Sequence, residues 1–186
     1  MRRRRLAVLF RAVLVLPPYV VLWLWSFFAA AVLLVGWIAA LILGRLPLRF
    51  HRWLAAYLRY VGQVTAWFEV LSGRYPMPHQ GDRHPFAIEI PRPQPQRRLV
   101  TLLRIVLGLP ALVLASVFSV ILTTSAIGAW FVALILGRTT AGLQELGTFC
   151  LRYQLETSAY LMLLTPRYPR LEPAPPPAEQ LLIPGL

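Results

Sequence analysis

The sequence contains the same unit twice. Residues 4–76 align with residues 97–169 at a constant offset of 93 positions, without a gap, and 26 of the 73 aligned positions are identical. The longest shared stretch runs from Ala40 to Arg45 and is repeated from Ala133 to Arg138. Each unit is mostly apolar and longer than a solenoid repeat, so the duplication resembles the parallel or inverted repeats of membrane proteins. Any fold proposed for this chain therefore has to place one unit twice.

The composition predicts a membrane protein. Apolar residues make up 58% of the 186 residues, charged residues only 14%, and the mean hydropathy is +0.61. No soluble domain of this length needs so much apolar surface. The net charge is +12, and all 19 basic residues are arginines. Near a membrane, each exposed arginine contributes about 1 kcal/mol of attraction to anionic headgroups. We therefore expect a bilayer with anionic headgroups as a partner, and we do not expect nucleic acid, because the polar scaffold of a nucleic-acid-binding protein is missing.

Each unit begins with a long apolar run. These runs are about 33 residues without a charge, at positions 12–44 and 105–137. A membrane-spanning helix needs about 20 apolar residues, so both runs are long enough. Pro17-Pro18 and Pro110 predict a break near the start of each run, which leaves spans at residues 19–43 and 111–136. The N-terminal arginines and the apolar residues after them imitate a secretory signal, but the same element recurs in mid-chain, so we expect a permanent helix.

The second element of each unit has the spacing of a helix with one narrow polar stripe. These elements occupy residues 46–71 and 139–164. In the first, Arg59 and small residues share one face and aromatic residues share the other. Such a helix can lie in the headgroup plane with its aromatic face in the acyl boundary, which is the slightly favoured placement. It can also cross the bilayer with its stripe against a partner helix, although a central arginine costs about 2.5 to 3.5 kcal/mol there.

Basic residues at both ends of both runs bear on membrane topology. For a single crossing, this distribution conflicts with the excess of arginine expected on the cytoplasmic side. The conflict disappears if each unit starts and ends in the cytoplasm, either through two crossings or through a hairpin bent within the run. We therefore expect a multi-pass protein of the cell membrane, with units in the same orientation and with cytoplasmic termini.

The chain divides into four segments. The predicted boundaries are a first membrane unit at 1–77, a proline-rich linker at 78–96, a second membrane unit at 97–170 and a proline-rich disordered tail at 171–186. The predicted fold is an all-α integral membrane protein of two tandem repeats, each with a long transmembrane helix followed by an amphipathic helix.

Few residues could carry chemistry. The candidates for lipid anchoring or for polar contacts between helices are Arg59, Arg152, Tyr60, Tyr153, Glu145, Glu156, Arg45 and Arg138. Arg152 and Glu156 are one helical turn apart and can neutralise each other. His79, Asp82 and His84 match no regular spacing of metal ligands, so a solvated loop is the expectation there. We predict no catalytic residue, no metal site and no cofactor.

The order of motifs resembles a known family. An apolar run is followed by Leu-Ile-Leu-Gly-Arg, then a helix with Leu-Arg-Tyr, then, in the second unit, Leu-Leu-Thr-Pro-Arg-Tyr-Pro. This order resembles the small bacterial membrane proteins called domain of unknown function 4389, over both units. The usual Tyr-Pro-Pro-Phe ending of that family is altered in both copies, after Tyr75-Pro76 and after Tyr168-Pro169. The family has no assigned activity, so the resemblance implies a class and a location without a mechanism.

Two hypotheses from different classes remain. The first is a non-enzymatic integral membrane scaffold or accessory subunit, which associates with a membrane protein complex or organises anionic lipid. The second is a small transporter or channel component with a polar pathway between the duplicated units, lined by Arg59, Arg152, Glu145 and Glu156. The transporter requires the second helices to cross the bilayer with their stripes facing each other. A lipid enzyme would require the few acids and histidines to converge.

Overall fold

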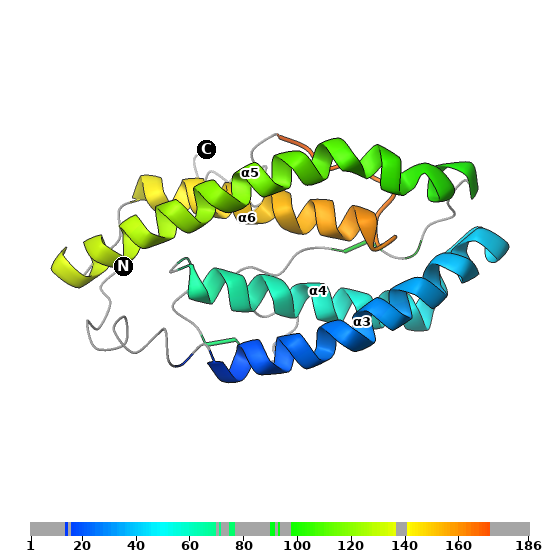
Figure 1. The fold of residues 1–186 in the computed structure, drawn as a ribbon, viewed down its shortest axis with the longest axis horizontal. Helices are drawn as coiled ribbons and strands as arrows, with labels where there is room; N and C mark the ends of the chain where they lie inside the picture. Colours follow the sequence, from blue (N-terminus) through cyan, green and yellow to red (C-terminus); the bar gives the residue numbers. More distant parts are fainter. Residues whose placement is uncertain are drawn as a thin grey trace, which may run out of the picture.

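The described part of the chain is entirely helical apart from short connections. A computed structural model describes residues 14, 16–69, 71, 75–76, 90–91, 93, 98–136 and 141–171. Within these residues the helices are α3 (Leu16–Leu43), α4 (Leu48–Phe68), α5 (Arg98–Leu136) and α6 (Ala141–Leu161). Each unit is a long apolar helix followed by a shorter one (Figure 1). The predicted all-α class with two tandem repeats is confirmed.

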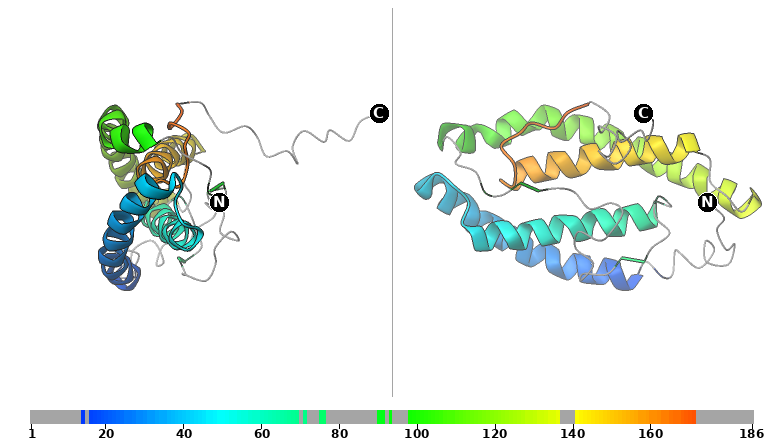
Figure 2. Two further views of the ribbon diagram at one scale, coloured as in Figure 1. Left: turned by 90° about the vertical axis from the view of Figure 1, so that its right-hand side faces the viewer. Right: turned by 180° about the vertical axis from the view of Figure 1, so that it is seen from behind.

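The four helices form a bundle of two layers. Within each unit the shorter helix packs back along the longer one, so α4 lies on α3 and α6 lies on α5. Between the units α3 contacts α5, and α4 contacts α6. Seen from its end, the bundle has α3 and α5 on one side and α4 and α6 on the other (Figure 2). We call these the α3/α5 layer and the α4/α6 layer.

The two units run in opposite directions. Arg98, at the start of α5, donates a hydrogen bond from Nη2 to the carbonyl oxygen of Ile42 at the end of α3, over 2.9 Å. At the same end of the bundle, Nε2–H of His51 donates to the carbonyl oxygen of Leu164 over 3.3 Å, which joins the start of α4 to the end of α6. Figure 1 shows the same opposition in its colours. The two units are thus antiparallel within the bundle, while their orientation relative to a membrane stays a prediction.

An approximate twofold relation explains the opposed orientation. At the other end of the bundle, a Cβ added at Gly147 would lie 2.6 Å from Cδ2 of Leu71. By the offset of 93, Leu71 corresponds to Leu164, and His51 corresponds to Gln144 near Gly147. The two ends of the α4/α6 contact are thus related by the repeat. Because the units are antiparallel, the surface of the shorter helix in one unit packs against the equivalent surface in the other unit. The distribution of arginines along the sequence does not predict such packing.

The ends of the helices follow directly from local sequence. α3 ends at Leu43 and is followed by Gly44, whose φ of 69° favours a residue without a Cβ and whose N–H donates to the Ala40 carbonyl oxygen over 2.9 Å. α4 and α6 are closed by matching bonds to the carbonyl five residues back, from Leu71 to Ala66 and from Leu164 to Ala159. The repeat therefore encodes the same helix ending twice.

One predicted helix boundary is wrong. Pro17 and Pro18 lie in the first turn of α3, where proline is well tolerated, but α5 continues through Pro110 as one helix of 39 residues. Pro110 removes one backbone hydrogen bond from the helix interior. The turns before it compensate by packing, because Thr101 and Arg104 are both fully covered by the rest of the protein. Tertiary contacts thus override the local break.

Candidate functional site

The two shared tyrosines hold the two layers together. The ring of Tyr60 lies 5.6 Å from that of Trp25, and the ring of Tyr153 lies 4.9 Å from that of Phe118. Trp25 and Phe118 are equivalent by the offset of 93, so each unit uses its tyrosine in the same way. Both tyrosines are buried, and the Tyr60 hydroxyl donates to the Pro18 carbonyl oxygen over 3.4 Å. These side chains contact the long helix of their own unit.

The shared Arg-Tyr-Pro motif has a second packing role. Tyr75 lies edge-on to Trp67 at 5.3 Å, and Tyr168 lies edge-on to Tyr160 at 5.5 Å. The offset of 93 relates these two pairs as well. The motif therefore folds the segment after each second helix back onto the end of that helix.

The aromatic face of α4 is not free for lipid. Trp25 of α3 contacts Trp53 and Tyr57 as well as Tyr60, with ring centroids 5.6 to 6.0 Å apart. The Ser26 hydroxyl lies 2.9 Å from the hydroxyl of Tyr57. The expectation that this face sinks into the acyl boundary is therefore wrong, because α3 covers it. Sequence periodicity shows that a face is apolar but not which partner covers it.

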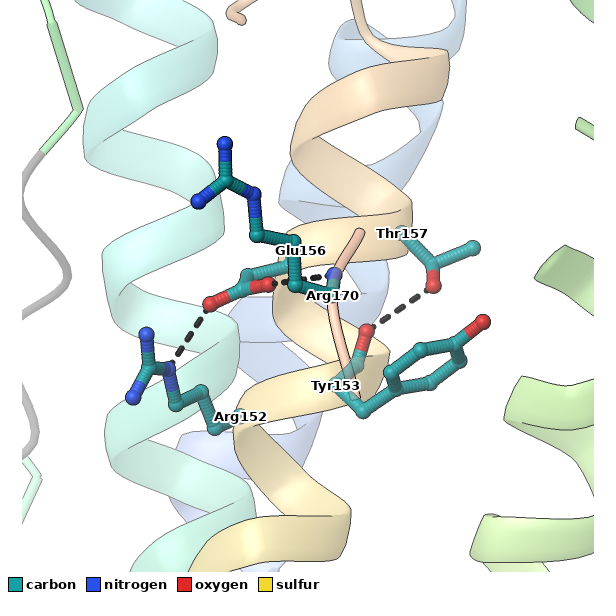
Figure 3. A network of polar contacts seen from close by, with 5 residues as sticks. All are labelled: Arg152, Tyr153, Glu156, Thr157 and Arg170. Carbon is teal, nitrogen blue, oxygen red and sulfur yellow. Dashed lines mark hydrogen bonds and ion pairs between the residues drawn. The ribbon is translucent and has the colours of Figure 1, made fainter. Parts of the chain in front are cut away.

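A small polar network lies on α6 (Figure 3). Nε of Arg152 donates to Oε1 of Glu156 over 2.7 Å, and the side chains are 38% and 25% exposed. The other carboxylate oxygen of Glu156 accepts the backbone N–H of Arg170 over 3.3 Å. Thr157 bonds within the helix, from its hydroxyl to the Tyr153 carbonyl oxygen. Glu156 is thus neutralised by Arg152 and also anchors the segment that follows α6.

The other candidate residues are not gathered around one point. Arg59 is half-buried on α4, Glu145 is exposed near the start of α6, and Arg45 is exposed between α3 and α4. Arg138 lies outside the described residues, as do His79, Asp82 and His84. Within the described ranges, no group of three or more histidine, cysteine or acidic residues is close enough to hold a metal ion.

Small residues allow α4 and α6 to approach closely. Ala55, Gly62 and Ala66, from the predicted stripe of α4, are all buried. On α6, a Cβ at Gly147 would lie 2.6 Å from Cδ2 of Leu71, so a side chain there would require Leu71 to shift. Close contact through small residues is typical of helices that associate within membranes. Burial also lowers the pKa of His51 in this contact, more than its hydrogen bond to Leu164 raises it. This histidine is therefore held neutral.

The sequence did not single out Arg104, which is the most deeply buried charged residue of the described chain. Its side chain is 1% exposed, its Nη2 donates to the Thr165 carbonyl oxygen over 2.9 Å, and its guanidinium lies 4.3 Å from the centre of the Tyr160 ring. Its Nε and Nη1 are buried without a hydrogen-bond partner. The available signal was the repeat itself, since Arg104 matches Arg11 in the first unit.

The largest surface feature is the outer side of the α3/α5 layer. Nearly all exposed large apolar side chains of the described residues belong to α3 and α5, whereas α4 and α6 contribute only Leu48, Phe68 and Leu146. Residues 16–43 and 106–132 are long and apolar enough to cross a membrane. An apolar surface of this extent indicates contact with lipid or with another protein. We treat this surface as the candidate functional site.

Comparison with known proteins gives one match. The family described as domain of unknown function (DUF4389) matches the chain in two segments, over residues 5–80 and 98–171. The resemblance and the tandem two-unit form are thereby confirmed. No curated protein matches the chain, and no solved structure matches it.

Proposed function

The chain belongs to the domain of unknown function 4389 family, with the domain present twice, and from this premise we propose that it is a non-enzymatic membrane protein. Its role is that of a scaffold or accessory subunit, which organises anionic lipid or accompanies a membrane protein complex. The observation that carries the proposal is the difference between the two layers, because one presents a continuous apolar surface and the other carries the charges.

The polar residues support a structural role. Arg152 and Glu156 form an ion pair, and Arg98 donates a hydrogen bond to the end of α3. Arg104 donates to the Thr165 carbonyl oxygen and lies over the Tyr160 ring. The shared tyrosines pack within their own units. A catalytic site needs reactive groups that converge beside a space for a substrate. In the described part of the chain, the polar groups named above instead bond within one helix or hold neighbouring segments together.

Exposed arginines on α4 support an attraction to anionic lipid. Arg49 and Arg52 are both exposed at the start of that helix. Neither is opposed by an acid on α4, since the helix from Leu48 to Phe68 contains no acidic residue. Each such arginine near a membrane surface contributes about 1 kcal/mol of attraction.

The transporter alternative receives less support. It needs a polar pathway between the stripes of α4 and α6. Those helices do contact each other, but Ala55 and Ala66 on the stripe of α4 are buried, and a Cβ at Gly147 of α6 would lie 2.6 Å from Leu71. Close packing of this kind favours a closed helix contact over a conducting path.

Vesicle flotation tests the proposal. The full chain is mixed with vesicles of phosphatidylcholine, or of phosphatidylcholine with phosphatidylglycerol, and floated on a density gradient at several salt concentrations. We expect flotation with both, and more with the anionic vesicles at low salt. The R49Q/R52Q variant should lose that preference, whereas Arg152→Gln should keep most of it, because Glu156 already neutralises Arg152. A chain that floats with neither vesicle type contradicts the proposal.

A further inference from the structure

We infer that the bundle lies flat in one leaflet of an anionic membrane, with the α3/α5 layer among the acyl chains and the α4/α6 layer at the headgroups. This inference rests on the proposed membrane function and adds the orientation of the protein and the surface that contacts lipid. The occupant of the exposed apolar surface is thus the acyl region of a single leaflet.

The first argument is length. Exposed apolar side chains extend along α5 from Leu99 to Phe131. At 1.5 Å per residue this stretch is about 48 Å long, against a hydrocarbon core of about 30 Å. To fit across the core the helix would have to tilt by about 50°, beyond the usual range of 0 to 40°. A helix in the plane of the membrane has no such limit.

The second argument is the connection between the units. α4 ends at one end of the bundle, and α5 starts at the other end, where Arg98 contacts Ile42. Residues 70–97 therefore have to lead from one end to the other, and by sequence they include six charged residues and six prolines. If the helices stood across the bilayer, this connection would have to cross the hydrocarbon, where a segment with six charged residues and six prolines is costly when exposed to lipid. In a flat bundle both ends remain on one side.

The third argument is the chemistry of the α3/α5 layer. α3 contains no charged residue, Arg104 of α5 is buried, and Arg98, exposed at the first residue of α5, donates to the Ile42 carbonyl oxygen. The exposed hydroxyls of Ser116 and Thr124 donate to carbonyl oxygens of their own helix, those of Val113 and Val120. Such bonds satisfy a hydroxyl without water, as a lipid-facing helix requires.

The fourth argument is thickness. A helix with its side chains is about 10 to 12 Å across, and one leaflet contributes about 15 Å of hydrocarbon. A single layer of two helices fits this depth. The exposed Arg49 and Arg52 then lie on the opposite layer, at the level of the headgroups. A bundle inserted to this depth would expand the area of the leaflet that it enters and not that of the opposite leaflet.

Depth measurements with spin labels along α3 test the inference. The background is Cys150→Ser, which removes the chain's one cysteine. Single cysteines are then placed at exposed positions along one face of α3, namely Val20, Leu24, Ala31, Val35 and Ile42. From first to last these positions cover about 33 Å of helix. The labelled full chain is reconstituted in vesicles of phosphatidylcholine with phosphatidylglycerol, and collision with oxygen and with a water-soluble nickel chelate reports depth. Labels at Arg52 and Ala56 on α4 serve as matched controls.

The outcomes separate the orientation from the proposed function. The flat arrangement predicts one common depth for all five positions on α3 and access of the nickel chelate at both control positions. A profile that is deepest at Ala31 and shallow at both ends shows a helix across the bilayer, which overturns the flat arrangement and leaves the scaffold proposal standing. Labels on α3 that contact water throughout overturn both.

Discussion

The two layers of the bundle are built from the same repeat but differ in how much of their apolar surface is exposed. The α3/α5 layer leaves a wide apolar surface exposed, whereas the α4/α6 layer has most of its small and aromatic residues buried. Hydropathy already marks α3 and α5 as the helices that could cross a membrane, but it does not show that the aromatic face of α4 is covered by Trp25 of α3. The difference shows that the apolarity of a whole helix marks it for the membrane, whereas packing within the bundle decides whether an apolar face of a shorter helix stays exposed.

The comparison also shows what the sequence could predict. The repeat at offset 93 predicted two copies of a long helix and a shorter one, and it also marks equivalent contacts such as Tyr60 with Trp25 and Tyr153 with Phe118. The match to the family over both units was predicted as well. These successes depend on local periodicity and on identity between the copies, both of which are visible in one sequence.

The failures concern contacts between units. The opposed orientation depends on Arg98 reaching Ile42 and on His51 reaching Leu164, contacts between residues 56 and 113 positions apart. The helix through Pro110 depends on burial against the end of the second unit, and the contacts of Arg104 with Thr165 and Tyr160 belong to the same packing. Such contacts have no signature in hydropathy or charge, so the sequence alone could not supply them.

The largest expected effect comes from charging the exposed layer. Phe28 and Val120 are 66% and 67% exposed on α3 and α5. In the F28R/V120R variant each arginine should cost up to about 3 kcal/mol in the acyl region, so most of the chain should fail to float with vesicles. The matched control is A56R/T148R, with exposed positions on α4 and α6, which should float as the parent does. Equal loss in both variants would remove the distinction between the layers.

A smaller effect is expected from filling the contact between α4 and α6. Gly147→Leu installs the residue that the first unit has at Leu54, and its Cβ would meet Leu71 at 2.6 Å. Overpacking of this kind costs about 1 to 3 kcal/mol, so the midpoint of thermal unfolding in detergent should fall. Gly142→Ala is the control, because a Cβ there meets nothing within 4 Å. An unchanged midpoint for Gly147→Leu would argue against the α4/α6 contact.

The polar network should matter least among the charged contacts. Arg152 and Glu156 are partly exposed, so Glu156→Gln should lower the free energy of unfolding by only about 0.3 to 0.5 kcal/mol. Denaturant titration in detergent micelles measures this difference, with Glu145→Gln as the control at an exposed position of the same helix. A loss of several kcal/mol would mean that the network has a role beyond this ion pair.

The last effect is confined to a range of pH. Burial lowers the pKa of His51 below its ordinary value of 6.5. Stability from the neutral imidazole is therefore present above pH 6.5 and is lost as the pH falls through the lower pKa of the folded state. His51→Gln, the residue at the equivalent position of the second unit, should weaken the fall in the unfolding midpoint below pH 6.5. The same pH profile in both proteins would show that His51 is not held neutral.

The central claim is that one layer contacts lipid while the other does not, and residue-resolved photolabelling tests it most directly. A carbene precursor dissolved in the acyl phase and a second one dissolved in water are activated separately on the full chain in anionic vesicles. The account predicts that the lipid-phase reagent modifies exposed residues of α3 and α5, such as Phe28 and Val120, while the aqueous reagent modifies α4 near Arg52. Equal lipid-phase labelling of all four helices, or none on α3 and α5, would contradict it.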